Sequence, residues 1–268
     1  MVITSTSNQK IKEIRKLHTR KERERTGLFF VEGIRLVVEA LEKEAEIETL
    51  IYSPQLLASI FAESKIEQFA NLGGNVIEVS GQVFRSLAKK EHPQGIAAVV
   101  HQQWHPLVDI AFKPNDNWIV LETIRDPGNL GTILRTLDGI GGAGVILLGD
   151  CCDPYDATAT RASMGAIFTQ SILKATFEEF ASWKKEIDIP LIGTSDHEEG
   201  IHYREYAYSN PVMLMMGSER AGLPKTHLEL CDGIVTIPME GSCDSLNLSI
   251  ATGIVLYEIH YRQQSGRN

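Results

Sequence analysis

Short apolar runs alternate with amphipathic stretches along most of the chain, and this alternation predicts an α/β protein. The first part predicts a small α/β unit, with a helix over about Asn8–Arg25, a strand over Phe29–Glu32, a helix over Gly33–Lys43, a strand over Ile47–Ser53, a further helix, and short strands near Val76 and Ile96. The segment 102–117 is polar and holds two prolines, which is typical of an exposed linker. We therefore predict a domain at 1–105 and a linker at 106–117.

From Trp118 onward the alternation becomes regular and predicts a second domain at 118–268. Its predicted strands are Trp118–Glu122, Val145–Leu148, Ile167–Leu173, Pro190–Thr194, Val212–Met216 and Gly233–Ile237, and its predicted helices are Asn129–Gly139, Thr158–Met164, Phe177–Glu186 and Ile250–Tyr261. Short strands separated by helices predict a mostly parallel sheet with helices on both faces. Ligands of such sheets bind outside the carboxyl ends of the strands.

Three polar segments follow predicted strands of this second domain. They are Asp126-Pro-Gly-Asn129-Leu-Gly-Thr-Ile-Leu-Arg135, Met216-Gly217-Ser-Glu219-Arg-Ala-Gly222-Leu-Pro224 and Ile237-Pro-Met-Glu-Gly-Ser-Cys-Asp-Ser245-Leu-Asn247-Leu-Ser249. Taken singly, the first is explained by a helix cap with a surface arginine, the second by a turn, and the third by a cap on the last helix. Their joint occurrence at strand ends predicts one composite pocket.

Composition narrows the class of protein. The chain has 268 residues with 43% hydrophobic content, which suffices for one large domain or two smaller ones. Its apolar runs are too short to span a bilayer and no signal-peptide core follows Met1, so we expect a cytoplasmic protein with no membrane partner. The four cysteines, at 151, 152, 231 and 243, show no CxxC spacing and indicate neither a disulfide framework nor a metal site.

One motif is misleading. The run Gly139-Ile-Gly141-Gly-Ala-Gly144 matches the glycine pattern of dinucleotide-binding proteins. That pattern needs a strand before the glycines and a helix after them, whereas here a helix precedes and a strand follows. These glycines are better explained as the end of a helix and a turn. No P-loop or nucleophile elbow is present, so nucleotide hydrolysis and acyl-serine chemistry lose support.

Charge is distributed unevenly. The net charge is −9, but residues 1–105 hold 14 basic and 13 acidic side chains, against 12 and 22 in the remainder. Near the start, eight basic residues crowd one short segment, and these are Lys10, Lys12, Arg15, Lys16, Arg20, Lys21, Arg23 and Arg25. A solvated helix face explains such a cluster as readily as a nucleic-acid contact does. Charge alone does not distinguish these two explanations, so other features of the chain are needed.

The three polar segments resemble the signature motifs of the SpoU (TrmH-type) family of RNA ribose 2′-O-methyltransferases, which use S-adenosylmethionine. The similarity covers about 118–264 and includes N-L-G-x-x-x-R, G-S-E-x-x-G-L and I-P-M-x-G-x-x-x-S-L-N-x-S in family order. Residues 1–105 resemble, more weakly, the substrate-binding domain that many ribosomal-RNA members carry in front. With that resemblance, the basic cluster becomes a candidate RNA contact.

The resemblance implies a SPOUT-type catalytic domain with a deep trefoil knot and a homodimer formed through the knotted region. It also implies that backbone around Thr194, Gly217, Ile237 and Leu246 binds the cofactor adenosine. The catalytic positions of the family map onto Asn129, Arg135, Glu219, Ser245 and Asn247. The separate first domain favours ribosomal RNA, most simply 23S, over transfer RNA.

The role of Arg135 stays open at the level of sequence. Family proposals make it the base, but a free arginine has a pKa of about 12.5–13.8, so neutralising it at pH 7 costs roughly 7–9 kcal/mol. It can instead grip an RNA phosphate, or act with that phosphate as the proton relay. Three other functions also remain: a tRNA 2′-O-methyltransferase, a non-catalytic RNA-binding or ribosome-assembly factor, and a small-molecule enzyme using another nucleotide. The intact polar set favours methyl transfer to RNA.

Overall fold

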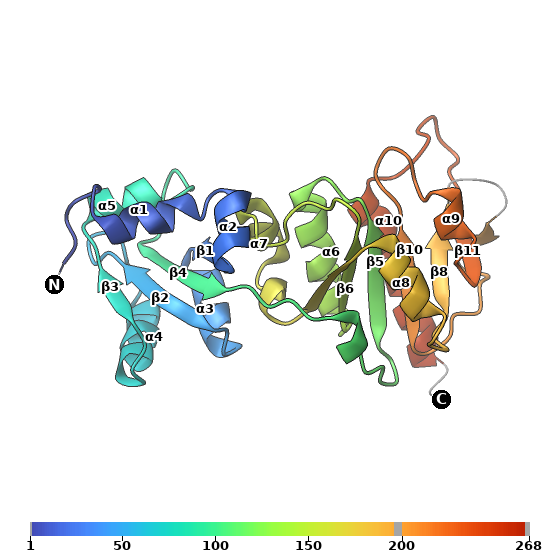
Figure 1. Ribbon diagram of the computed structural model, residues 1–268, viewed down its shortest axis with the longest axis horizontal. Coiled ribbons are helices and arrows are strands. Elements are labelled where there is room, and N and C mark those ends of the chain that lie inside the picture. The colour runs from blue at the N-terminus through green and yellow to red at the C-terminus, as the bar shows by residue number, and fades with distance from the viewer. Residues whose placement is uncertain (1, 196–199, 266–268) are drawn as a thin grey trace. The chain divides into compact units, whose positions relative to one another are not determined.

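The computed structural model describes residues 2–195 and 200–265. The chain forms two compact units, one of Met1–Gln102 with Tyr155–Thr169 and the other of Gln103–Pro154 with Gln170–Asn268. Figure 1 labels the elements of both units. Within the described residues, no helix is both long and apolar enough to cross a membrane.

The first unit contains a four-stranded mixed sheet in the order β1 (Leu28–Glu32), β4 (Ile96–His101), β2 (Ile47–Tyr52) and β3 (Val76–Glu78). Strand β4 is antiparallel to both neighbours, and β3 runs parallel to β2. Helices α1 (Gln9–Lys16) and α5 (Gly81–Leu87) cover one face, where Ile14 and Phe84 pack against Phe30 and Ile51. Helices α3 (Ile34–Glu42) and α4 (Ile60–Asn71) pack against each other, and α3 also contacts β1 and β4.

The predicted helix over 8–25 is wrong, because the structure has two helices there. Helix α1 ends at Lys16 and α2 (Arg20–Thr26) begins after Thr19, whose backbone is extended with φ −101° and ψ 138°. Leu17, between the helices, is buried in the core of the unit. The similar charged residues on both sides, in 10–16 and 20–25, conceal this break.

The segment Tyr155–Thr169, which the sequence pattern places in the second domain, belongs to the first unit. It contains α7 (Ala157–Ser163) and a short 3-10 helix, η2 (Ala166–Phe168). The Phe29 ring lies 4.7 Å from the Tyr155 ring and 6.2 Å from the Phe168 ring, between centroids. These contacts join residues far apart in sequence, so periodicity does not reveal them.

The second unit contains a seven-stranded sheet in which every described strand pair is parallel, which confirms the predicted sheet type. The spatial order is β7 (Ser171–Ala175), β6 (Gly144–Leu148), β5 (Asn117–Glu122), β10 (Val212–Met216), β8 (Leu191–Thr194), β11 (Gly233–Thr236) and β9 (Ile201–His202). From β5 the chain adds β6 and β7 on one side, and later strands build the other side. The β5/β10 pair is therefore the switch point, where parallel sheets bind ligands.

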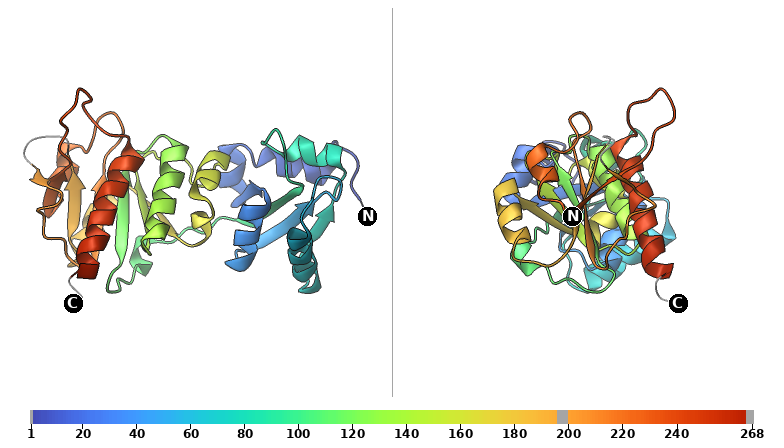
Figure 2. Two further views of the ribbon diagram at one scale, coloured as in Figure 1. Left: turned by 180° about the vertical axis from the view of Figure 1, so that it is seen from behind. Right: turned by 90° about the vertical axis from the view of Figure 1, so that its right-hand side faces the viewer.

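Helices cover both faces of this sheet. Helices α6 (Pro127–Gly139) and α10 (Leu248–Ser265) lie side by side on one face, and α8 (Phe177–Lys184) lies on the other, together with α9 (Lys225–Leu228) (Figure 2). The core beneath α8 includes Trp118, Ile146, Phe180 and Met213. A further short 3-10 helix, η1 (Leu107–Asp109), lies in the segment before β5.

Candidate active site

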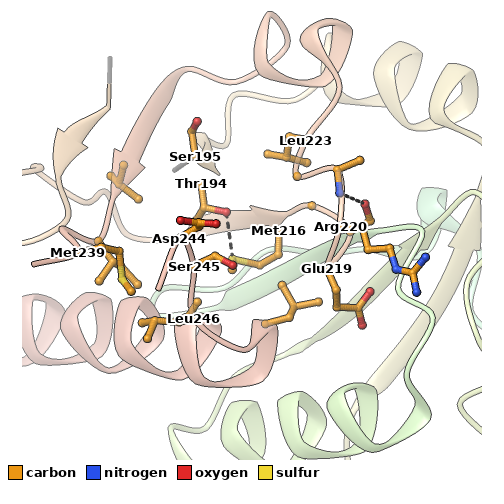
Figure 3. Close-up of a pocket in the computed structure, with 18 residues that line it drawn as sticks. Thr194, Ser195, Met216, Glu219, Arg220, Leu223, Met239, Asp244, Ser245 and Leu246 are labelled. Atoms are coloured by element: carbon orange, nitrogen blue, oxygen red, sulfur yellow. Dashed lines mark hydrogen bonds between the residues drawn. The ribbon is translucent and has the colours of Figure 1, made fainter. Parts of the chain in front are cut away.

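A pocket of about 390 Å³ opens beyond the carboxyl ends of β8, β10 and β11 (Figure 3). Its size lies within the range of small-molecule sites, about 300–1,000 Å³. Its apolar lining includes Leu223, Val235, Ile237, Leu246 and Leu248, and its carboxylates come from Glu219 and Asp244. The four residues predicted to surround a cofactor, Thr194, Gly217, Ile237 and Leu246, all line this pocket.

The loop after β10 requires glycine at its first position. A Cβ atom on Gly217 would lie 2.1 Å from the carbonyl carbon of Gly222, closer than any real contact permits. Ser218 and Gly222 each donate a backbone hydrogen bond to the other, at 3.1 Å, and Gly222 has a φ of +64°. The loop therefore folds tightly back on itself and leaves open space beside β8 for a ligand.

A chain of hydrogen bonds joins the three polar segments at the edge of this pocket. The Asn247 side-chain amide donates to Asn129 Oδ1 at 3.0 Å, and the Asn129 amide donates to Glu219 Oε1 at 3.2 Å. The same carboxylate accepts longer hydrogen bonds from the backbone of Arg125 and Asp126, at 3.5 and 3.4 Å. The contact lies at the β5/β10 switch point, and it brings three predicted site residues together.

Helix capping arranges this contact. Asp126, and not Asn129, caps α6, because its side chain accepts the Asn129 backbone N–H at 2.9 Å and Pro127 begins the helix. Asn129 thus lies within the first turn, where its side chain is free to bridge. Asn247 caps α10, since its Oδ1 accepts the backbone N–H of Ser249 at 3.0 Å. An aspartate followed by proline at a helix start is a readable cap signal.

Ser245 and Arg135 lie outside this chain of hydrogen bonds. Ser245 lines the pocket and is exposed. Arg135 is exposed on α6, and its guanidinium makes no hydrogen bond or ion pair with residues 2–195 or 200–265. Its positive charge therefore remains available to a ligand.

Two further arginines border the site and were not singled out from the sequence. Arg125 forms an ion pair with Asp150 at 2.6 Å. Arg220 follows Glu219, and Figure 3 shows both side chains turned to the same side, away from Thr194 and Ser195. A run of charged residues after a buried strand is the signal that marks both positions.

The cysteines near the sheet are poor nucleophiles. Burial raises the pKa of the Cys151 thiol to about 11, and burial likewise raises the pKa values of Cys152 and Cys231 to about 12. The thiolate is the reactive form, so these three remain inert near neutral pH. Cys243 is exposed in the loop before Ser245. No three His, Cys, Asp or Glu side chains of the described chain are grouped to hold a metal ion.

The basic cluster of the first unit is only partly available to a ligand. Arg23 is 3% exposed, and it donates to the Leu17 carbonyl at 3.0 Å and to Asp156 at 3.5 Å, so we correct the prediction that it contacts RNA. The three other arginines of the cluster have partners within the unit. Arg15 donates a hydrogen bond to Ser86, Arg20 pairs with Glu24, and Arg25 pairs with Glu22. Lys10, Lys12, Lys16 and Lys21 are exposed.

Comparison with known proteins places this geometry in a family. Residues 116–257 match the SpoU rRNA Methylase family, and residues 8–98 match the MRM3-like substrate binding domain. The chain is 30% identical to the 23S rRNA (guanosine(2553)-2′-O)-methyltransferase of Bacillus subtilis, over 96% of this chain and 98% of that one.

Two solved structures are similar to this chain, one over nearly its whole length and one over part of it. An AdoMet-bound rRNA methyltransferase from Sinorhizobium meliloti shares 37% identity with a TM-score of 0.89, over 97% of both chains. A TrmH/SpoU tRNA modifying enzyme from A. aeolicus shares 25% identity with a TM-score of 0.51, over 57% of this chain and 77% of its own.

The fold and site define a parallel α/β protein with a pocket beyond the carboxyl ends of its strands. The chain belongs to the SpoU family of RNA methyltransferases. The predicted family, enzyme class and cofactor, S-adenosylmethionine, are thereby confirmed.

Proposed function

We propose that this protein transfers a methyl group from S-adenosylmethionine to a ribose 2′-oxygen of 23S ribosomal RNA. The observation that carries the proposal is the Asn247–Asn129–Glu219 chain at the edge of the pocket. Ribosomal RNA is favoured over transfer RNA because the rRNA enzymes match nearly the whole chain, including the first unit. The tRNA enzyme matches only 57% of it.

The pocket has the chemistry that this cofactor needs. Bound there, S-adenosylmethionine supplies an electrophilic methyl carbon on a cationic sulfonium. The carboxylates of Glu219 and Asp244 offer negative charge to its cationic groups, and Ile237 and Leu246 offer apolar surface to its adenosine. The tight turn at Gly217 brings the backbone of its loop beside this surface. We propose that these residues, with Thr194, hold the cofactor.

The polar chain is suited to orient the reacting ribose. Glu219 receives the Asn129 amide and two backbone N–H groups, so its carboxylate is held in one place. Fixed groups of this kind accelerate a reaction by alignment. We propose that Asn129, Glu219 and Asn247 align the target nucleotide, with Ser245 at the pocket rim. Arg135, which is exposed, is proposed to hold the phosphate beside that nucleotide.

The exposed lysines of the first unit are proposed to contact the RNA backbone. Changing Lys10, Lys12 and Lys16 of α1 together to alanine should weaken RNA binding, because three phosphates are then no longer neutralised. The slope of log affinity against log salt should fall by about 2, at roughly 0.7 for each such phosphate of a single strand. Binding titrations at several salt concentrations measure this slope.

A matched triple variant controls for the loss of charge alone, and it changes three exposed lysines of the second unit, Lys113, Lys174 and Lys185. It should leave the slope near that of the unaltered protein. Equal slopes for both triple variants would remove α1 from the proposed RNA surface.

We also propose the knot, the homodimer and the cytoplasmic location that the family resemblance implies. Support for the dimer comes from α10, where Ile250, Tyr257 and Tyr261 are exposed large apolar side chains. Such a surface is typical of an interface. A monomeric mass by sedimentation at micromolar concentration would contradict the dimer.

Transfer of labelled methyl to unmodified ribosomal and transfer RNA, followed by alkaline hydrolysis, tests the function. A 2′-O-methyl group blocks cleavage, so label in alkali-resistant dinucleotides from 23S RNA is the expected result. Label in mononucleotides would mean base methylation. Label from tRNA alone would redirect the substrate, and cofactor binding without transfer to any RNA or ribosomal particle would indicate a non-catalytic factor.

A further inference from the structure

A second contact joins the segments after β5 and β10, apart from the bond between Asn129 and Glu219. Glu122, the last residue of β5, lies with its Oε2 3.0 Å from Nε2 of His227 on α9, and both side chains are largely buried. The other carboxylate oxygen accepts the hydroxyl of Thr123. His227 follows closely on the loop from Gly217 to Leu223, so Glu122 links the end of β5 to the end of that loop.

The hydrogen bonds around His227 define its orientation. Its Nδ1 lies 3.2 Å from the hydroxyl of Thr226, which can donate to it. A neutral imidazole arranged in this way carries its proton on Nε2 and donates a hydrogen bond to Glu122. The ring also stacks on Phe177, at 3.8 Å between centroids and 20° between planes. The contact thus has two separable parts, a hydrogen bond and a ring stack.

This contact lies where the segment that carries Asn129 leaves β5. Thr123 has a φ of +50°, a strained conformation that is rare for a β-branched residue. Its bond to Glu122 helps to hold that conformation. Two and three residues later, the backbone N–H groups of Arg125 and Asp126 point at Glu219. The direction of the chain at Thr123 therefore decides where these two donors point.

The side chains of Glu122 and Thr123 are closely packed. A Cβ atom on Gly149, the residue after β6, would lie 2.8 Å from the Thr123 hydroxyl and 3.2 Å from Glu122 Oε1. The carboxylate is thus enclosed by His227, Thr123 and the bare backbone of Gly149. Neither Glu122 nor His227 lines the cofactor pocket. Any effect they have on the reaction must pass through other residues.

We infer that Glu122 and His227 are positioning residues for methyl transfer, which set the geometry of the Asn129–Glu219 contact through the strained turn at Thr123. This inference rests on the proposed function. It also carries a structural consequence that holds without any activity, namely that the Nε2 hydrogen bond keeps the backbone of residues 123–126 ordered.

Two substitutions of His227 separate the hydrogen bond from the ring stack. His227→Phe keeps a ring for Phe177 but removes the donor, whereas His227→Gln keeps a donor near the position of Nε2 but removes the ring. The phenylalanine variant should lose about tenfold or more in kcat, because small misplacements near a reacting centre cost up to about 10²-fold. Its KM for S-adenosylmethionine should stay within about threefold, because the pocket lining is unchanged. The glutamine variant should recover most of kcat.

Hydrogen exchange of the backbone at 123–126 gives a readout independent of activity. Exchange should be faster in His227→Phe and near that of the unaltered protein in His227→Gln. Full activity together with slow exchange in the phenylalanine variant would overturn the inference. A defect confined to the glutamine variant would also overturn it, because the positioning role would then belong to the ring stack on Phe177. Absence of methyl transfer by the unaltered protein would count against the proposed function alone, since the exchange comparison would still decide the positioning role.

Glu122→Gln covers the case in which His227→Phe does not fold. It preserves the shape of the side chain and weakens the acceptor by removing its charge. Exchange at 123–126 and kcat should change in the same direction as in His227→Phe, by a smaller factor. Unchanged exchange together with unchanged kcat would overturn the inference.

Discussion

Glu219→Ala is expected to lower the rate of methyl transfer by about 10²-fold, the cost of a small misplacement at a reacting centre. The substitution removes the acceptor for the Asn129 amide and for the backbone N–H groups of Arg125 and Asp126. The Asn129 side chain is then held only by the hydrogen bond that it accepts from Asn247, and its own amide has lost its acceptor. Single-turnover kinetics at saturating cofactor and RNA measure this loss without interference from product release.

Two control variants make the Glu219 experiment specific. Glu219→Gln keeps the length of the side chain and one carbonyl acceptor, so it should retain more activity than alanine. Glu240→Ala removes the same charge from an exposed position in the loop after β11, and it should leave the rate within about twofold, since exposed substitutions seldom perturb the fold. A rate for Glu219→Ala close to that of Glu240→Ala would remove Glu219 from the catalytic set.

Most strands of the second unit were predicted because they are short runs rich in apolar residues between polar segments. The predicted strand over Ile167–Leu173 is wrong in its first part, since η2 ends at Phe168 and β7 begins at Ser171, and β9 was not predicted. Strand β10 occupies Val212–Met216, as predicted, and β5 begins one residue earlier than expected, at Asn117. Parallel strands place their carboxyl ends at one edge, so the three polar segments could be assigned to that edge from the sequence alone. The second and third segments line the pocket, whereas the first reaches it through the hydrogen bond from Asn129 to Glu219. The hydrogen bonds that join Asn129 to Glu219 and Asn247 follow from that edge, but their partners cannot be read from spacing.

Other features depend on contacts that sequence periodicity does not encode. The 155–169 segment reads as a continuation of the second domain, yet its aromatic rings pack on Phe29 of the first unit. Arg23 has the same local composition around it as its neighbours, and only the fold shows that it is buried beside Asp156. The contact between Glu122 and His227 spans 105 positions and involves no recognisable motif. Long-range packing decides all three.

Arg135→Ala is expected to lower methyl transfer by about 10²–10³-fold, the usual cost of removing one group that stabilises charge at a reacting centre. Arg135 is exposed, and in the described part of the chain no carboxylate pairs with it. A guanidinium of this kind is well suited to grip a phosphate with two parallel hydrogen bonds. Assays at saturating cofactor, with RNA varied, measure the loss in kcat and KM separately. A nearly unchanged rate would end the catalytic assignment.

The same arginine allows its two proposed roles to be separated. Suppose that Arg135 holds the phosphate beside the target ribose. Replacing that phosphate by a neutral methylphosphonate should then slow the unaltered enzyme strongly. It should slow Arg135→Ala little further, because that variant has already lost the contact with the phosphate. Arg135→Lys should then recover part of the rate, since lysine keeps the charge without the bidentate fork. If Arg135 is instead the base, both enzymes should respond equally to the methylphosphonate, and the lysine variant should show a rate that rises with pH toward about 10, the ordinary pKa of lysine. The phosphate role is favoured because the guanidinium of Arg135 is exposed and no described carboxylate pairs with it.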